Sequence, residues 1–268
     1  MNGHLKLSER EWELFARFVA KSNPPPILHR YRRVSDWTIK ELATPEVHVA
    51  GVDDMNDPFE YRVPLHIDVE KLRDALRTYA QKQLGMSAAA AEAEANVIGD
   101  IELEYGRGKL EELRAASGLI CATSDPRSNR IWAYYGDSHR GICISYSTAF
   151  APFCFAREVS YADPSGPIDL MDTLDRDPSL LSNHVSCRKG AEWAFEQEYR
   201  IPVGPFPSDH TRLLPISTDS IVEIRLGAKI KPDFKVRVLD AINSYPAKPR
   251  IIQMGCDHQT FRLKETAV

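Results

Sequence analysis

The stretch WAFEQEYRI, residues 193–201, predicts a strand whose two faces differ in character. Successive strand residues point to opposite faces, so apolar and aromatic side chains line one face while Glu196, Glu198 and Arg200 line the other. Two carboxylates two residues apart on one face repel each other, and one arginine neutralises only one of them fully. One carboxylate is left available, which makes this strand a candidate site. The plainer interpretation is a solvated, mutually paired face of an edge strand.

The composition is that of an ordinary globular protein. The 268 residues are 43% hydrophobic and 27% charged, which suffices for a sizeable core. A net charge of -4 gives no overall basic field, so non-specific nucleic-acid binding is not expected, although a local basic patch could hold a phosphate-bearing ligand. The five cysteines are scattered without a C-x-x-C pair, which favours a reducing compartment, and we expect a cytoplasmic protein. No apolar run is long enough to span a membrane, so no membrane partner is expected.

The order of segments predicts a single α+β domain over residues 27–268, preceded by an amphipathic helix in residues 1–23. A strand begins near Ile27, and a short helix capped by Ser35 or Asp36 leads to a second strand at residues 46–50. Further strands are expected at residues 118–123, 141–146, 157–161 and 220–226, and a final helix at 232–243 leads to the apolar residues 250–254. We therefore expect a mixed or antiparallel central sheet.

Residues 68–116 have helical composition and spacing, including an alanine-rich run, with interruptions near Gly85 and Gly106. They predict a helical insertion that forms a lid or side layer. Such an insertion could also hold a protein partner.

Three other segments are candidate binding sites. The N-D-P-F-E loop at residues 56–60 either positions a ligand or satisfies its own turn. Trp132 and Tyr135 belong to an aromatic cluster that either stacks a nucleobase or nicotinamide ring or packs in the core, and core packing is the better expectation for Trp132. The basic run at residues 29–33 either binds phosphate through its arginines or is solvated.

Several motifs with well-understood chemistry are absent from the sequence. The eight histidines show no H-x-x-x-H or H-E-x-x-H spacing, so no metal is expected. There is no G-x-S-x-G elbow and no cysteine in a recognisable catalytic context. The phosphate loops G-x-x-x-x-G-K-[ST] and G-x-G-x-x-G are absent as well, which argues against ATP-driven and Rossmann-type chemistry.

Three motifs occur in order along the chain: N-D-P-F-E at residues 56–60, W-x-x-Y followed by G-I-C at 132–143, and K-x-x-x-W-x-x-E-x-E-Y-R at 189–200. Together they resemble an uncharacterised bacterial family of unknown function, and the resemblance spans most of residues 27–230. The protein is expected to act in phage defence or a toxin system, an expectation that the family itself does not supply. The family suggests no chemistry of its own.

A more distant likeness is to ADP-ribosyltransferases. These enzymes have a strand with a basic or aromatic residue, then a helix and a second strand, and later a strand with the catalytic glutamate, sometimes as E-x-E. Arg30 or Tyr31 and then Glu198 would occupy those places here. Gly51 and Val52 stand where such folds often carry serine or threonine. The resemblance implies an ADP-ribosyltransferase-like sheet and NAD as a substrate.

Cleavage of the nicotinamide–ribose bond passes through an oxocarbenium-like state, which a carboxylate hydrogen-bonded to the ribose 2-OH stabilises. Glu198 is the expected carboxylate, and Glu196 is expected to orient the acceptor or remove its proton. The candidates for binding NAD are Arg30, Tyr31, Asn56, Asp57, Trp132, Tyr135 and Arg200. The acceptor, whether protein, nucleic acid or small molecule, is open.

Two other functions compete with this prediction. A magnesium-dependent nuclease or phosphoesterase would gather four carboxylates around the ion, namely Asp57, Glu60, Glu196 and Glu198. A non-enzymatic interaction module would instead use the helical insertion to bind a partner, with the charged strand as a brace.

Overall fold

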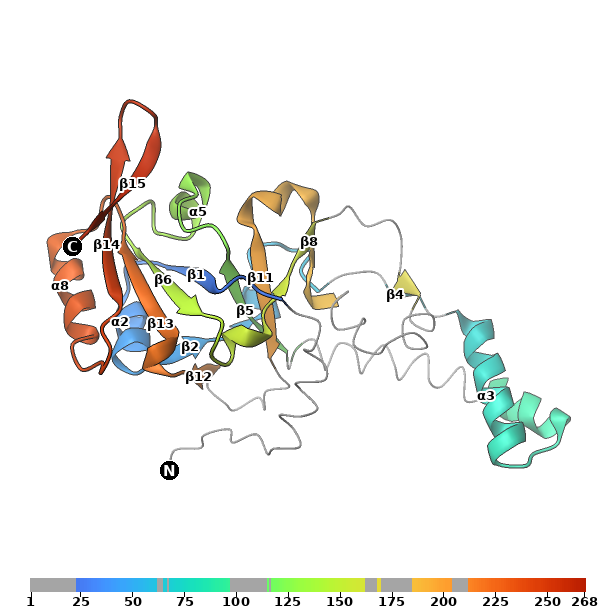
Figure 1. The fold of residues 1–268 in the computed structure, drawn as a ribbon. Helices are drawn as coiled ribbons and strands as arrows, with labels where there is room; N and C mark the ends of the chain where they lie inside the picture. The colour runs from blue at the N-terminus through green and yellow to red at the C-terminus, as the bar shows by residue number, and fades with distance from the viewer. Residues whose placement is uncertain are drawn as a thin grey trace.

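The computed structural model describes residues 23–61, 65–66, 68–96, 115, 117–161, 168–169, 185–203 and 212–268. Within these ranges the chain forms a nine-stranded sheet with helices around it (Figure 1). The strand order is β15-β14-β13-β6-β1-β5-β11-β7. The ninth strand, β3, also pairs with β5 but stands outside this linear order. In the described sheet the β13–β14 pair is parallel and the other pairs are antiparallel. The expected α+β fold with a mixed sheet is confirmed.

The elements of the large sheet are β1 (Ile27–Arg32), β3 (Ala50–Gly51), β5 (Gly118–Thr123), β6 (Ile142–Ser147), β7 (Arg157–Glu158), β11 (Glu198–Val203), β13 (Ile221–Leu226), β14 (Arg250–Asp257) and β15 (Arg262–Ala267). Small two-stranded pairs are formed by β2 (Glu46–His48) with β12 (Leu213–Pro215), β8 (Ser160–Tyr161) with β10 (Arg188–Lys189), and β4 (Leu65–His66) with β9 (Ile168–Asp169). The α-helices whose bounds are described are α2 (Asp36–Ala43), α3 (Val69–Gln83), α5 (Asn129–Tyr134) and α8 (Pro232–Ala241). Short 3-10 turns are η1 (Val52–Asp54), η2 (Phe153–Phe155), η3 (Ala191–Glu196) and η4 (Thr218–Ser220).

Local sequence explains the first part of the fold. The side chain of Ser35 caps α2 by accepting a hydrogen bond from the backbone N–H of Thr38, as expected. The predicted strand at residues 46–50 is divided, because β2 pairs with β12 whereas β3 pairs with β5. The predicted strand at 157–161 is divided in the same way between β7 and β8. A strand pattern read along one segment cannot show that its two halves have different neighbours.

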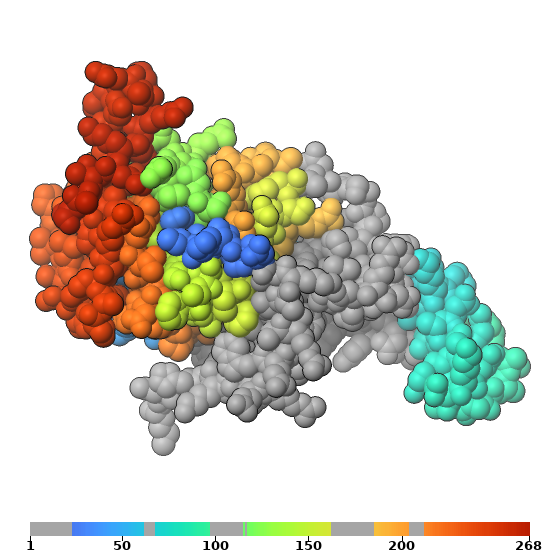
Figure 2. Space-filling view, in the orientation of Figure 1, coloured from blue at the N-terminus to red at the C-terminus, as the bar shows by residue number. Residues whose placement is uncertain are grey.

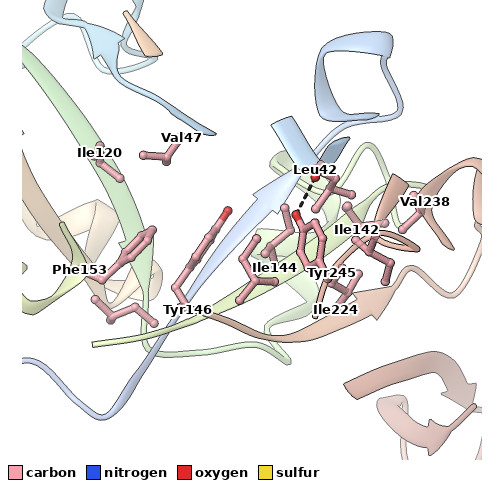
Figure 3. Close-up of a cluster of buried hydrophobic side chains, with 14 of the residues drawn as sticks. Leu42, Val47, Ile120, Ile142, Ile144, Tyr146, Phe153, Ile224, Val238 and Tyr245 are labelled. Atoms are coloured by element: carbon pink, nitrogen blue, oxygen red, sulfur yellow. Dashed lines mark hydrogen bonds between the residues drawn. The ribbon is translucent and has the colours of Figure 1, made fainter. Parts of the chain in front are cut away.

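The main core lies where α2 and α8 pack on the sheet (Figure 3). Apolar side chains of β6 and β13, such as Ile144 and Ile224, are fully buried against Leu42 of α2 and Val238 of α8. Tyr245 follows α8, and its hydroxyl donates a 2.6 Å hydrogen bond to the carbonyl of Leu42. The two helices and this core therefore cover one face of the sheet.

The predicted helical insertion is partly described. Asp68 caps α3 by accepting hydrogen bonds from two backbone N–H groups, and residues 88–96 are helical again after Gly85, whose φ is +66°. These helices project from the right of the body in Figures 1 and 2. Gly106 and residues 1–22 of the helix predicted for residues 1–23 lie outside the described residues. Within the described part of the chain no helix is long and apolar enough to cross a membrane.

The β14–β15 hairpin ends the sheet, and β15 is not predicted by the sequence analysis. Its residues Arg262, Lys264 and Glu265 are charged, so the segment lacks the apolar alternation by which a strand is recognised. Pairing with β14 over six positions makes it a strand.

The centre of the sheet is partly split. β1 pairs with β6 over six positions, but with β5 it shares the single position His29–Thr123. Side chains of both strands line a pocket at this place. The split between β1 and β5 is therefore where the fold leaves space beside its most polar strands.

Candidate functional site

The segment with the two glutamates is not one continuous strand. Residues up to Glu196 belong to η3, Gln197 has the left-handed backbone φ of +45°, and β11 begins only at Glu198. The strand prediction is therefore wrong for residues 193–197 and correct from Glu198 onward. The end of β5 holds this corner, because the Thr123 hydroxyl donates a 2.6 Å hydrogen bond to the Glu196 carbonyl. The N–H of Ser124 donates to the Gln197 carbonyl at 3.2 Å.

Both glutamates nevertheless join one group of charges, which we call the carboxylate cluster. It consists of Glu60, Lys189, Glu196, Glu198 and Arg200. Each of these residues is at most 7% exposed, so the interpretation as a solvated edge face is wrong. Three carboxylates share two cations, which leaves one negative charge in excess. Burying such a group is costly unless hydrogen bonds satisfy it.

Lys189 lies between the carboxylates. Its ammonium is 2.6 Å from Glu196 Oε2, 3.5 Å from Glu198 Oε2 and 3.6 Å from a Glu60 oxygen. The parallel pair of β10 with β8 brings it there, since Lys189 lies opposite Tyr161, whose hydroxyl accepts a 2.7 Å hydrogen bond from the Glu198 backbone N–H. Burial opposes the charge on Lys189, but Glu198 and Glu196 outweigh it and raise the lysine pKa.

Arg200 serves as the brace of this cluster. Its guanidinium donates to both oxygens of Glu60, at 2.6 and 2.5 Å, to the Ser186 carbonyl at 2.9 Å and to Glu198 Oε2 at 2.9 Å. It is fully buried and does not line the pocket. The structure therefore places Arg200 behind the carboxylates, not at a position that contacts a ligand.

The environments of the two glutamates drive their pKa values apart. Burial raises the pKa of Glu196, Glu198 adds to this, and Lys189 offsets only part of it. Burial also opposes ionisation of Glu198, but Arg200 and Lys189 outweigh it and lower the pKa of Glu198. Burial raises the pKa of the Cys121 thiol, which hydrogen-bonds Glu198. Opposite shifts in neighbouring carboxyls are typical of an acid–base pair, in which the group with the raised pKa takes up a proton more readily than the group with the lowered pKa.

Tyr135 connects Glu196 to the N-D-P-F-E loop. Its hydroxyl donates a 2.5 Å hydrogen bond to Glu196 Oε1 and accepts one of 2.8 Å from Asn56 Nδ2. Two residues predicted from separate motifs are thus brought together with a predicted catalytic carboxyl. Both line the pocket beside the cluster.

This pocket, which we call the carboxylate pocket, has a volume of about 350 Å³. Glu196 and Glu198 line it from β11 and its corner, and Arg30 lines it from β1. Arg30 is 5% exposed and donates to the carbonyls of Cys121 and His48, at 3.0 and 3.1 Å. Its Nη1 has no hydrogen-bond partner, and its guanidinium forms no salt bridge with a described residue.

A buried guanidinium of this kind keeps its charge. Burial and the neighbouring Arg32 lower the pKa of Arg30 to about 10, so it remains protonated at neutral pH. An unpartnered N–H of a buried cation is energetically unfavourable. An anionic group in the carboxylate pocket would supply the missing acceptor.

The other predicted site residues lie in different surroundings. Tyr31 lines the pocket, and its hydroxyl donates to the Asp125 carbonyl. Asp57 is buried, and Oδ1 accepts a hydrogen bond from the Phe59 N–H, so it shapes the loop and does not line the pocket. Trp132 is fully buried between Tyr31 and His139, in the core position that was the better expectation. Of the two residues of the predicted aromatic cluster, Trp132 and Tyr135, it is Tyr135 that lines the pocket.

Sequence reasoning did not identify the role of Lys189. The signal was its place in the K-x-x-x-W-x-x-E-x-E-Y-R motif, seven residues before Glu196. Glu60 was considered as part of the N-D-P-F-E loop and as a metal ligand, and its pairing with Arg200 could not be foreseen because 140 residues separate them. In the described residues no three or more histidine, cysteine or acidic side chains are grouped in a way that could hold a metal ion.

A second hollow adjoins the first, and we call it the aromatic pocket. It has a volume of about 620 Å³ and lies between β1, α2 and β2. Trp37 of α2 lines it with 69% of its surface exposed. Tyr31, Arg32, Arg33 and Tyr135 line both pockets.

Comparisons of the chain with protein-family models, with curated proteins and with solved structures found no match.

Proposed function

We propose that the chain is an ADP-ribosyltransferase-like enzyme that cleaves the nicotinamide–ribose bond of NAD. The observation that carries the proposal is the pair of buried carboxyls with opposite pKa shifts, set in one pocket with a buried arginine whose Nη1 has no hydrogen-bond partner among the described residues. A nucleophilic substitution at an anomeric carbon needs an ionised carboxylate, a proton acceptor and an anchor for the negatively charged part of the substrate. Glu198, Glu196 and Arg30 have the required chemistry.

The reaction assigns one task to each group. The C–N bond between ribose and nicotinamide breaks, and its electron pair leaves with nicotinamide. Glu198 stabilises the oxocarbenium-like ribose through the 2-OH, because that hydrogen bond strengthens as positive charge develops. The acceptor's lone pair forms the new bond to the anomeric carbon, and its proton passes to Glu196. Arg30 binds the pyrophosphate through Nη1, and Asn56 and Tyr135 hold the neighbouring groups in place.

The topology supports the same proposal. Along the chain β1 with Arg30 is followed by α2, then by β2 and β3, and much later by β11 with Glu198. This is the order expected of an ADP-ribosyltransferase-like sheet. The split between β1 and β5 provides room for the substrate beside those strands.

The test is release of labelled nicotinamide from NAD by the parent, by Glu198→Gln and by Glu192→Gln. Glu192 is an exposed carboxylate in the same segment, which makes it a matched control. We expect Glu198→Gln to lose about 100-fold to 1000-fold in rate, as when a group that stabilises transition-state charge is removed. Glu192→Gln should retain the parent rate. Thermal melting of each variant separates lost chemistry from unfolding, and equal release by folded Glu198→Gln and the parent would contradict the proposal.

A further inference from the structure

The aromatic pocket and the carboxylate pocket are joined through the four residues that line both. Tyr135 is the part of this shared wall that contacts the carboxylate cluster, through its hydrogen bond to Glu196. Glu196, Glu198 and Arg30 all line the carboxylate pocket and not the aromatic one. Of these three residues, Glu196 is the one that Tyr135 of the shared wall contacts by a hydrogen bond, so a ligand in the aromatic pocket approaches the cluster from the side of Glu196.

The lining of the aromatic pocket combines a flat ring with positive charge. Trp37 exposes its indole, and the Lys40 ammonium, which does not line the pocket, lies over one face of the ring at 5.3 Å from its centroid. Arg33 is exposed, lines both pockets and forms no ion pair with a described residue. Glu41 is the one carboxylate in the lining, and Arg32 neutralises it at 2.7 Å. The pocket therefore offers a surface for stacking and an excess of cations, in a chain whose net charge is -4.

A nucleotide has the complementary chemistry. A nucleobase stacks on an exposed indole, and its phosphate is bound by an arginine fork. A purely apolar ligand would leave Arg33 without a partner, and a simple anion would leave Trp37 uncovered. The volume of about 620 Å³ lies in the range of small-molecule sites.

We propose that the aromatic pocket is the acceptor subsite and that it binds a nucleotide, with its base on Trp37 and its phosphate at Arg33. The inference rests on the proposed function, because an acceptor has meaning only if NAD is cleaved. In this step a nucleophilic nitrogen or oxygen of the nucleotide bonds to the anomeric carbon of the ADP-ribose unit. The nicotinamide bond breaks with its electron pair, and the proton of the nucleophile passes to Glu196.

The first test is calorimetric binding in Glu198→Gln, so that no turnover consumes NAD. The probes are adenosine 5'-monophosphate, adenosine, a short single-stranded oligonucleotide and inorganic phosphate. Introducing Trp37→Ala should weaken binding of the monophosphate and of adenosine about 10-fold or more, the usual effect of losing a stacking platform. Arg33→Ala should weaken the monophosphate but not adenosine. Phe261→Ala and Arg262→Ala are matched controls, because both residues are exposed on the β14–β15 hairpin.

Competition with NAD distinguishes the acceptor from a second half of the NAD site. We expect the monophosphate to bind in the presence of saturating NAD, and stronger binding of the oligonucleotide would indicate a strand rather than a free nucleotide as the source. Displacement of the monophosphate by NAD would overturn the inference, as would failure of both the monophosphate and the oligonucleotide to bind. Binding is measured without turnover, so its failure is distinct from failure of NAD cleavage, which the nicotinamide assay reports.

Discussion

Two groups of linked charges lie on the same sheet, and they differ in burial and in how the charges are balanced. In the carboxylate cluster two cations serve three carboxylates. The other group, which we call the arginine network, links β13, β14 and β15 to the segment after β5 and consists of Arg127, Glu223, Arg225, Arg250 and Glu265. There three cations serve two carboxylates, and each glutamate contacts two arginines. None of these five residues lines either pocket.

The difference shows which property of a buried charge marks a site. In the arginine network, hydrogen bonds from Arg127 and Arg225 lower the pKa of Glu265 to about 2, so this carboxylate is satisfied and inert. In the carboxylate cluster one glutamate has a raised pKa while its neighbour has a lowered one. Ion pairing occurs in both groups, but in the arginine network only Glu223 and Arg225 are buried, whereas Arg127 and Arg250 are exposed. Of the two groups, only the carboxylate cluster has an excess of carboxylates, neighbouring carboxyls with opposite pKa shifts, and a pocket beside it.

The largest expected effect is on the reaction rate, and it tests whether Glu196 acts as a base while Glu265 of the arginine network does not. If Glu196 accepts the acceptor's proton, the rate must rise with pH through its raised pKa, because only the ionised form can accept a proton. Glu196→Gln should lose this rise and about 100-fold to 10,000-fold in rate, the usual contribution of a general base. The measurement is a pH–rate profile of nicotinamide release with water or the nucleotide as acceptor. Glu265→Gln should keep the parent profile, and an unchanged profile in Glu196→Gln would contradict the assignment.

The second prediction compares the two buried arginines. Arg200→Met leaves three carboxylates with Lys189 alone, so the free energy of unfolding should fall by about 3–5 kcal/mol, as when one partner of a buried ion pair is removed. Arg225→Met should cost less, about 1–3 kcal/mol, because Glu223 keeps Arg250 and Glu265 keeps Arg127. Urea titrations of both variants measure this difference. Equal losses would show that the two groups are balanced alike.

The smallest expected effect concerns acid stability of the arginine network. The folded pKa of Glu265 lies at about 2, below its ordinary value of 4.5. Its contribution is therefore fully present above pH 4.5 and is lost as the pH falls toward 2. The gap in urea midpoint between the parent and Glu265→Gln should narrow between pH 6 and pH 3. A gap that stays constant over this range would refute the assigned shift.

Much of the fold could be predicted because local patterns match local structure. The start of β1, the Ser35 cap and the strands β5, β6 and β13 follow from alternation and capping residues. The failures occur where a distant partner decides the structure. Residues 46–50 divide between two neighbours, and β15 becomes a strand through β14 despite its charged sequence.

The site was predictable in its residue types but not in its arrangement. Glu196 and Glu198 were identified from a strand pattern, although the left-handed Gln197 interrupts that strand. Asn56 and Tyr135 were identified from separate motifs, and the structure joins them to Glu196. The sequence could not show that the Arg200 guanidinium is paired with Glu60, or that the Trp132 ring packs between Tyr31 and His139. Both facts depend on contacts between segments far apart in the chain.

The Tyr135 hydroxyl can take part in three hydrogen bonds at once. A phenolic oxygen has one hydrogen and two lone pairs. Its hydrogen is directed at Glu196, and one lone pair accepts the hydrogen bond of Asn56. The second lone pair accepts no hydrogen bond from a described residue, so a donor on a ligand of the aromatic pocket, which Tyr135 also lines, could use it. A hydrogen leaving a ligand there can thus reach Glu196 by two short transfers through one oxygen, without the ligand touching the carboxylate.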